Sequence, residues 1–174
     1  YAINYNSLFF DYSGQDGMGD CQNFASQSIW YGLGGSNSAS AIANKQWPMI
    51  DDRSDGRGWF QLHEYVSDSG HHWPSVVSFA SYISSSSSST YGLRGTVTSG
   101  IATASYGDII QVGNSESGYY HSYIVVAHSG SSGSRTADNL WVAGHTEDMN
   151  YKHFSDVYSS SKYYRTIHIT GSYR

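Results

Sequence analysis

The residue with the clearest chemical potential is Cys21, the only cysteine among 174 residues. A single thiol forms no internal disulfide and supplies no thiolate cluster for a metal ion. A glycine-rich, turn-forming segment at 13–19 precedes it, and helix-compatible residues follow at 24–31, so a helix is predicted to begin at Cys21. The free N–H groups and partial positive charge of a helix start favour thiolate over thiol. We therefore expect Cys21 to have a lowered pKa and to act as a nucleophile, although a lone cysteine is commonly a buried, inert side chain.

A thiol nucleophile needs a base close by and a third group that fixes the ring of that base. Among eight histidines, His121 stands near the start of the strongest strand pattern in the chain, residues 119–128. A helix start packed against this strand would bring Cys21 and His121 together, so His121 is the predicted base. His128 ends the same strand and is expected at the opposite rim.

The third member is expected on the strand that pairs with the one bearing His121. That strand is predicted to begin at Asn139 and is followed by His145. If the Gly/Ser-rich segment between the two strands is a hairpin loop, antiparallel pairing places His145 near His121 and Asn139 near the loop. His145 is therefore predicted to hold the tautomer of His121. Asn139 or Asp138 is the alternative.

These residues need helices and strands to position them, and the chain supplies the helices first. A second helix is predicted after Pro74, with an apolar stripe at Val76, Phe79, Ala80 and Ile83. The pattern then changes to a period of two, which predicts strands at 96–98, 108–112, 119–128, 139–144 and 163–170. We expect a single α+β domain over residues 1–174, with N-terminal helices packed on an antiparallel meander.

Composition excludes several classes of partner. Charged residues make up only 13% of the chain, and 9 Lys+Arg against 14 Asp+Glu give a net charge of −5, so no basic surface for nucleic acid is expected. No apolar stretch is long enough to span a membrane. The pair His71-His72 lacks further ligands at metal spacing, and we expect neither a metal nor another cofactor. The low lysine content and the many Ser, Gly and Tyr residues suggest a secreted or cell-wall-associated bacterial protein, and we expect a monomer. Since the chain begins at Tyr1 and not at Met, we expect a mature or excised segment.

Residues 20–27, Asp-Cys-Gln-Asn-Phe-Ala-Ser-Gln, are followed by a Gly-Gly pair at 34–35. This segment resembles the signature of the bacterial putative amidase domain, whose usual form is Asp-Cys-Thr-Asn-Phe-Val-Ser-Gln. The resemblance continues through Gly-Asp-Ile-Ile at 107–110, His-Ser-Tyr-Ile-Val-Val at 121–126 and His-Thr-Glu-Asp at 145–148. The family belongs with the papain-like CHAP and NlpC-type cell-wall hydrolases. The resemblance implies a papain-like fold with Cys21 as nucleophile, His121 as base and His145 as orienter.

Two departures from the family pattern concern the residues around the cysteine. Gln22 replaces the usual Thr, and the glycine-rich approach is longer than usual. Gln15 lies six residues before Cys21, the spacing found in papain, and is the predicted side-chain donor to the oxyanion beside the Cys21 backbone N–H. Asp20 is expected to cap the helix.

The predicted function is that of a secreted cysteine amidase or endopeptidase acting through an acyl-enzyme, with bacterial peptidoglycan as the expected substrate and another peptide or amide as the alternative. Aromatic residues at Trp47, Trp59 and Trp73 either line the substrate cleft or pack in the core. Two other functions stay open. One is a non-catalytic, aromatic-rich glycan-binding module with an inert Cys21, and the other is a transpeptidase on the same fold.

Overall fold

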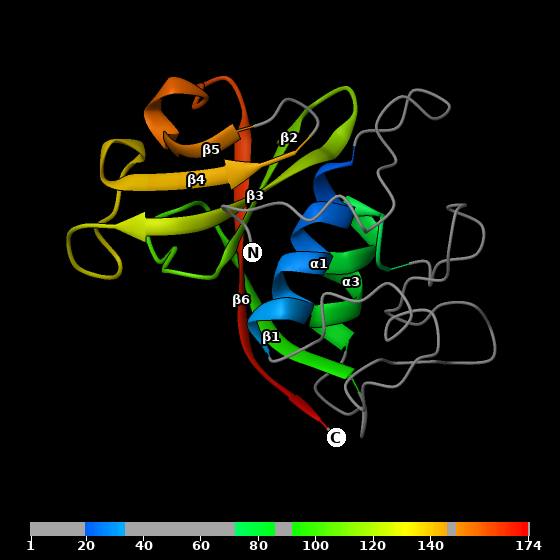
Figure 1. The fold of residues 1–174 in the computed structure, drawn as a ribbon. Helices are drawn as coiled ribbons and strands as arrows, with labels where there is room; N and C mark the ends of the chain where they lie inside the picture. Colours follow the sequence, from blue (N-terminus) through cyan, green and yellow to red (C-terminus); the bar gives the residue numbers. More distant parts are fainter. Residues whose placement is uncertain (1–19, 34–71, 86–91, 146–148, 174) are drawn as a thin grey trace.

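The structure is a computed structural model that describes residues 20–33, 72–85, 92–145 and 149–173. In this part of the chain two helices, α1 (Cys21–Gly32) and α3 (Val76–Ser85), lie side by side against a six-stranded sheet (Figure 1). The strands are β1 (Gly92–Ser99), β2 (Ile109–Asn114), β3 (Gly118–His128), β4 (Leu140–Gly144), β5 (Met149–His153) and β6 (Tyr163–Tyr173), with short 3₁₀ turns η3 (Ala137–Asn139) and η4 (Phe154–Asp156).

The sheet is antiparallel throughout, with strand order β1-β6-β2-β3-β4-β5. The expected α+β class is confirmed, but the expected simple meander holds only from β2 to β5. β6 lies between β1 and β2, where buried Ile167 is paired with Val97 on one side and Ile109 on the other. An apolar strand placed there buries its side chain against two neighbours, which an edge position would not allow.

The helices cover one face of the sheet, and their apolar side chains form the larger core. The predicted stripe of α3 is largely confirmed, with Phe79, Ala80 and Ile83 buried and Tyr82 added to them. On α1, every residue from Cys21 to Trp30 is buried, including several polar ones. Polar side chains buried to this extent must be hydrogen-bonded, and their partners define the site described below.

A second core lies on the opposite face of the sheet. It contains Ile110, Val125, Val142 and Phe154, so β2, β3 and β4 are covered on both faces. This explains why Ile109-Ile110 in β2 and Val125-Val126 in β3 are apolar at consecutive positions: neighbouring residues enter different cores. No helix in the described residues is long and apolar enough to cross a membrane.

Candidate active site

Cys21 is the first residue of α1, as predicted, and lies against the edge of β3. Its Sγ is 3.9 Å from the carbonyl oxygen of Tyr120, and a hydrogen bond from the backbone N–H of Ser122 also reaches the sulfur. These two residues flank His121. The β3–β4 pairs begin only at Ile124, so the thiol contacts a stretch of β3 that precedes those pairs.

Gln22 fixes α1 to the sheet at the level of Cys21. Its Oε1 accepts hydrogen bonds from Ser122 Oγ at 2.7 Å and from Gln111 Nε2 at 3.0 Å, and all three side chains are fully buried. Gln111 Oε1 in turn accepts from Arg165 Nε at 2.7 Å, which adds β6. The glutamine that replaces the usual Thr of the motif therefore joins the helix start to three strands, and it sets the position of Cys21 relative to β3.

Asp20, the residue before Cys21, binds the ring of His145. Asp20 Oδ2 and His145 Nδ1 are hydrogen-bonded at 2.8 Å, and the side chains of Asp20 and His145 are 0% and 11% exposed. The other carboxylate oxygen accepts from Asn23 Nδ2 at 2.8 Å. Asp20 occupies the N-cap position of α1, as expected, but its side chain makes no capping hydrogen bond to the helix backbone. A carboxylate facing an imidazole N–H forms a stronger, charge-assisted bond than one with a neutral amide.

The same turn of α1 holds the His145 ring on a second side and ties it to the core. Phe24 stacks on that ring with centroids 6.1 Å apart. Asn23 Oδ1 accepts from Trp73 Nε1 at 2.7 Å, and Ser26 Oγ donates to the Trp73 carbonyl. Trp73 is 0% exposed, so it packs in the core and does not line a cleft.

His121 occupies a different environment from His145. Its ring packs edge-on against Tyr123 with centroids 4.3 Å apart, and Tyr123 contacts Phe154 of the second core. Burial lowers the pKa of His121 to about 4, so the ring is neutral at pH 7. Within the described residues this ring makes no hydrogen bond. The structure thus brings the backbone of the residues on either side of His121 to Cys21, but it pairs His145 with Asp20 instead of with the His121 ring.

The thiol itself is not the activated group that the sequence suggested. Burial raises the pKa of Cys21 to about 11, the backbone N–H groups of Ser122 and Gln22 act in the opposite direction, and the nearby charge of Asp20 adds to the increase. The expectation of a lowered pKa is therefore wrong for this arrangement. A thiolate that is 2% exposed loses more hydration than the N–H groups of one helix start restore.

The other predicted residues lie away from these contacts. Asn139 Oδ1 accepts from the Thr136 N–H at the start of η3, and His128 pairs with Leu140 at the hairpin end of β3 and β4. The predicted antiparallel geometry is confirmed, since His145 follows the opposite end of β4. Gln15, Trp47 and Trp59 lie outside the described residues.

Sequence reasoning missed Asp20 and Gln22 as positioning residues. The available signal was the polar residues at 20, 22 and 23, which come at the start of a helix just before the apolar residues Phe24 and Ala25. Such residues at a buried helix start require partners in other elements. The sequence does not say which ones, because Ser122 and His145 are 100 and more residues away.

The fold and the site together define an α+β domain with a buried cysteine at a helix start, in contact with the strand that carries His121. Residues 1–169 match the family model described as the putative amidase domain, and the chain belongs to this family. Membership indicates amide hydrolysis in general terms. No curated protein and no solved structure matches the chain.

Proposed function

We propose that this protein is a cysteine-dependent amide hydrolase with Cys21 as its nucleophile. The observation that carries the proposal is the position of Sγ, at the start of α1 and between backbone groups of the two residues that flank His121. Family membership supports amide hydrolysis as the reaction. The papain-like character of the fold and a relationship to CHAP and NlpC-type hydrolases belong to the same proposal.

In the proposed reaction Cys21 attacks the amide carbonyl carbon while its thiol proton passes to Nε2 or Nδ1 of His121. The C–N bond breaks, His121 returns the proton to the leaving amine, and an acyl-enzyme thioester remains. Water, deprotonated by His121, then cleaves the thioester and releases the acid and the thiol. His121 suits this role because its ring is neutral at pH 7 and makes no hydrogen bond within the described residues. Its ring has to turn from Tyr123 towards the sulfur.

His145 is proposed as the residue that steadies the base once it has turned. The bond to Asp20 and the stacking on Phe24 fix the plane and position of the His145 ring. The carboxylate also stabilises positive charge that develops on the imidazoles in the transition state. For the oxyanion, we propose the backbone N–H of Cys21 at the free start of α1, with Gln15 as an additional donor.

The two pKa values point to a resting state in which thiol and imidazole are both neutral. A thiol with a pKa of about 11 does not transfer its proton to a ring with a pKa of about 4 before substrate binds. Proton transfer is therefore expected together with nucleophilic attack, as general base catalysis. One consequence concerns alkylation: slow alkylation of native Cys21 is expected whether or not the protein is an enzyme.

For the substrate we propose bacterial peptidoglycan, cleaved at an amide of the stem peptide or at its link to the glycan, by a monomeric protein that is secreted or bound to the cell wall. The test is digestion of purified sacculi, with new amine and carboxyl termini identified by mass spectrometry. Termini that appear with the wild type but not with Cys21→Ala support the proposal. Equal products from both proteins, or none from either with peptidoglycan and with simple peptide amides, would refute it. Transfer of the acyl group to an added amine would identify a transpeptidase.

One observation favours a second candidate, the non-catalytic glycan-binding module. A cysteine that is 2% exposed with a pKa of about 11 has the properties of an inert core residue. If the module interpretation is correct, the protein will sediment with sacculi, and Cys21→Ala will sediment equally well with no new termini from either.

A further inference from the structure

A cavity of about 470 Å³ lies at the end of α1, away from Cys21. Its apolar wall is formed by Ile29 and Leu33 of the α1 end, Ile124 and Val126 of β3, and Ile169 of β6. Cys21 and Gly32 are eleven residues apart on the helix, which corresponds to about 16 Å along its axis. The volume is within the range of small-molecule sites. Because this length of helix lies between them, the cavity is separate from the thiol site.

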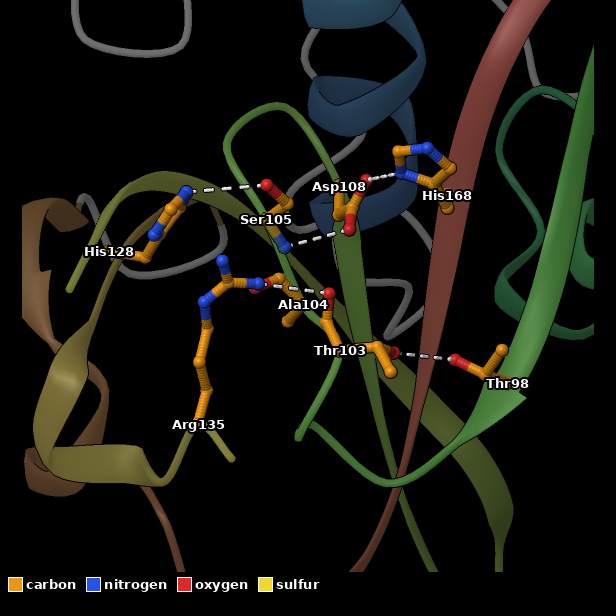
Figure 2. A network of polar contacts seen from close by, with 8 residues as sticks. All are labelled: Thr98, Thr103, Ala104, Ser105, Asp108, His128, Arg135 and His168. Atoms are coloured by element: carbon orange, nitrogen blue, oxygen red, sulfur yellow. Dashed lines mark hydrogen bonds and ion pairs between the residues drawn. The ribbon is translucent and has the colours of Figure 1, made fainter. Parts of the chain in front are cut away.

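A carboxylate–imidazole pair forms the polar part of the wall. Asp108 is 2% exposed; one of its oxygens accepts from His168 Nδ1 and the other from the Ser105 N–H at 2.8 Å (Figure 2). Since an ionised carboxylate only accepts, Nδ1 carries a proton, and Nε2 is the ring nitrogen left to hydrogen-bond a ligand. The His168 side chain is 51% exposed, so its Nε2 is accessible to a ligand from solvent.

Two tyrosine rings stand at the rim of the same cavity. Tyr106 is 75% exposed at the tip of the turn from Ser105 to Asp108, where Gly107 has a φ of +84°. Tyr31 is 44% exposed at the end of α1. Exposed aromatic rings next to a hydrogen-bonding pair offer both an apolar face and a polar edge to one ligand.

The charge of the lining limits the class of ligand. Among the described residues that line the cavity there is no Lys or Arg, and its one carboxylate is already bonded to His168. Phosphates and other strong anions therefore find no ammonium or guanidinium group there. A sugar ring fits the remaining chemistry, because its C–H face packs on tyrosine and its hydroxyl groups donate to an imidazole nitrogen. We propose that this cavity is a binding site for a neutral saccharide unit, separate from the proposed catalytic thiol.

The test is a titration of the Cys21→Ala variant of residues 1–174, which removes turnover from the measurement. The probes are the trimers of N-acetylglucosamine and of glucose, and binding is followed by isothermal calorimetry or by NMR shifts. We expect saturable binding of at least one trimer. Tyr106→Ala should weaken it at least about 3-fold and His168→Ala at least about 10-fold, since one removes a stacking face and the other a hydrogen-bond partner.

Controls keep the result interpretable. Tyr151→Ala removes a comparably exposed ring, 53% exposed, from β5, outside this cavity, and should leave the affinity unchanged. His168→Gln keeps a polar partner for Asp108 if His168→Ala unfolds the protein. No saturable binding with a Kd below about 10 mM for either trimer would overturn the proposal. The proposal would also be overturned if Tyr106→Ala and His168→Ala, added to Cys21→Ala, left the affinity for the trimers unchanged. Because Cys21 is absent from the assay, neither outcome depends on the amide hydrolase proposal.

Discussion

An aspartate bonded to a histidine Nδ1 lies next to each end of α1, and the two pairs differ in their surroundings. At the start of the helix, Asp20 and His145 are almost fully enclosed, with side chains 0% and 11% exposed, beside the thiol. At the end, Asp108 is enclosed but His168 is 51% exposed and borders a cavity. The same chemical pair is thus a buried positioning device in one place and an accessible surface in the other.

This difference shows that the pair alone does not define a site. Enclosure at the helix start strengthens the electrostatic effect of Asp20 on its neighbours, including the thiol whose pKa it raises. At the other end, solvent screens the imidazole and leaves it free to exchange water for a ligand. Substitutions near one end of α1 at a time test this difference.

The largest effect is expected from Cys21→Ala. Amide hydrolysis should fall by at least about 10⁴-fold because the nucleophile itself is lost. Release of amine from peptide amides and from sacculi measures it, and circular dichroism checks that the fold is kept. Cys21→Ser should be nearly as inactive. If Cys21→Ala retains wild-type activity, the cysteine hydrolase proposal fails.

His121→Ala should lose activity on the order of the loss at Cys21, about 10³-fold or more, because members of one catalytic unit are not additive. The matched control is His128→Ala on the same strand, which removes a ring bonded to Ser105 at the hairpin end and should matter much less. Equal losses at the two positions would show that the base is wrongly assigned.

Asp20→Asn and His145→Ala should each lower kcat by about 10- to 100-fold with little change in KM, since positioning residues carry no bond change. The control for Asp20→Asn is Asp138→Asn, an exposed carboxamide substitution at the hairpin end of β4. Asn139→Ala should also be mild. A loss at His145 as large as that at Cys21, with a small loss at His121, would make His145 the base.

The smallest effect is on stability. The folded-state pKa of His121 is about 4, below the ordinary 6.5, so the unfolded chain binds the proton more tightly. The stabilising contribution of the neutral ring is complete above pH 6.5 and is lost as the pH falls towards 4, in total about 3 kcal/mol. Urea unfolding of wild type and His121→Gln at pH 7 and pH 4.5 measures it. The gap between the two proteins should shrink at the lower pH, and an unchanged gap would contradict the lowered pKa.

The sequence predicted those features that depend on local pattern. The start of α1 at Cys21 follows from the glycine-rich turn before it, and the apolar stripe of α3 and the strands β2, β3, β4 and β6 follow from the pattern of apolar residues. β5 was missed because Met149–His153 is a largely exposed, polar edge strand with no alternating pattern. The position of β6 was missed because local pattern does not determine which strand a given strand pairs with.

In the site, the sequence selected residues correctly placed along the chain but not their partners. His145 does follow the end of β4 away from the hairpin, and its ring bonds to Asp20, the residue that precedes α1. The pKa of Cys21 was missed for a related reason. The helix start is visible in sequence, whereas the degree of burial that outweighs it is a property of the packed structure.

The placement of β6 has a consequence for how the molecule folds. Among the described strands β1 pairs only with β6, and β6 also supplies Arg165 to the glutamine cluster that anchors α1. During synthesis, β2 to β5 can form a hairpin series before β6 has been made, but the partner of β1 in the described sheet is made only then. The bond from Arg165 to Gln111 and the pairing of β1 are therefore completed late, because they wait for a strand separated by more than sixty residues from β1.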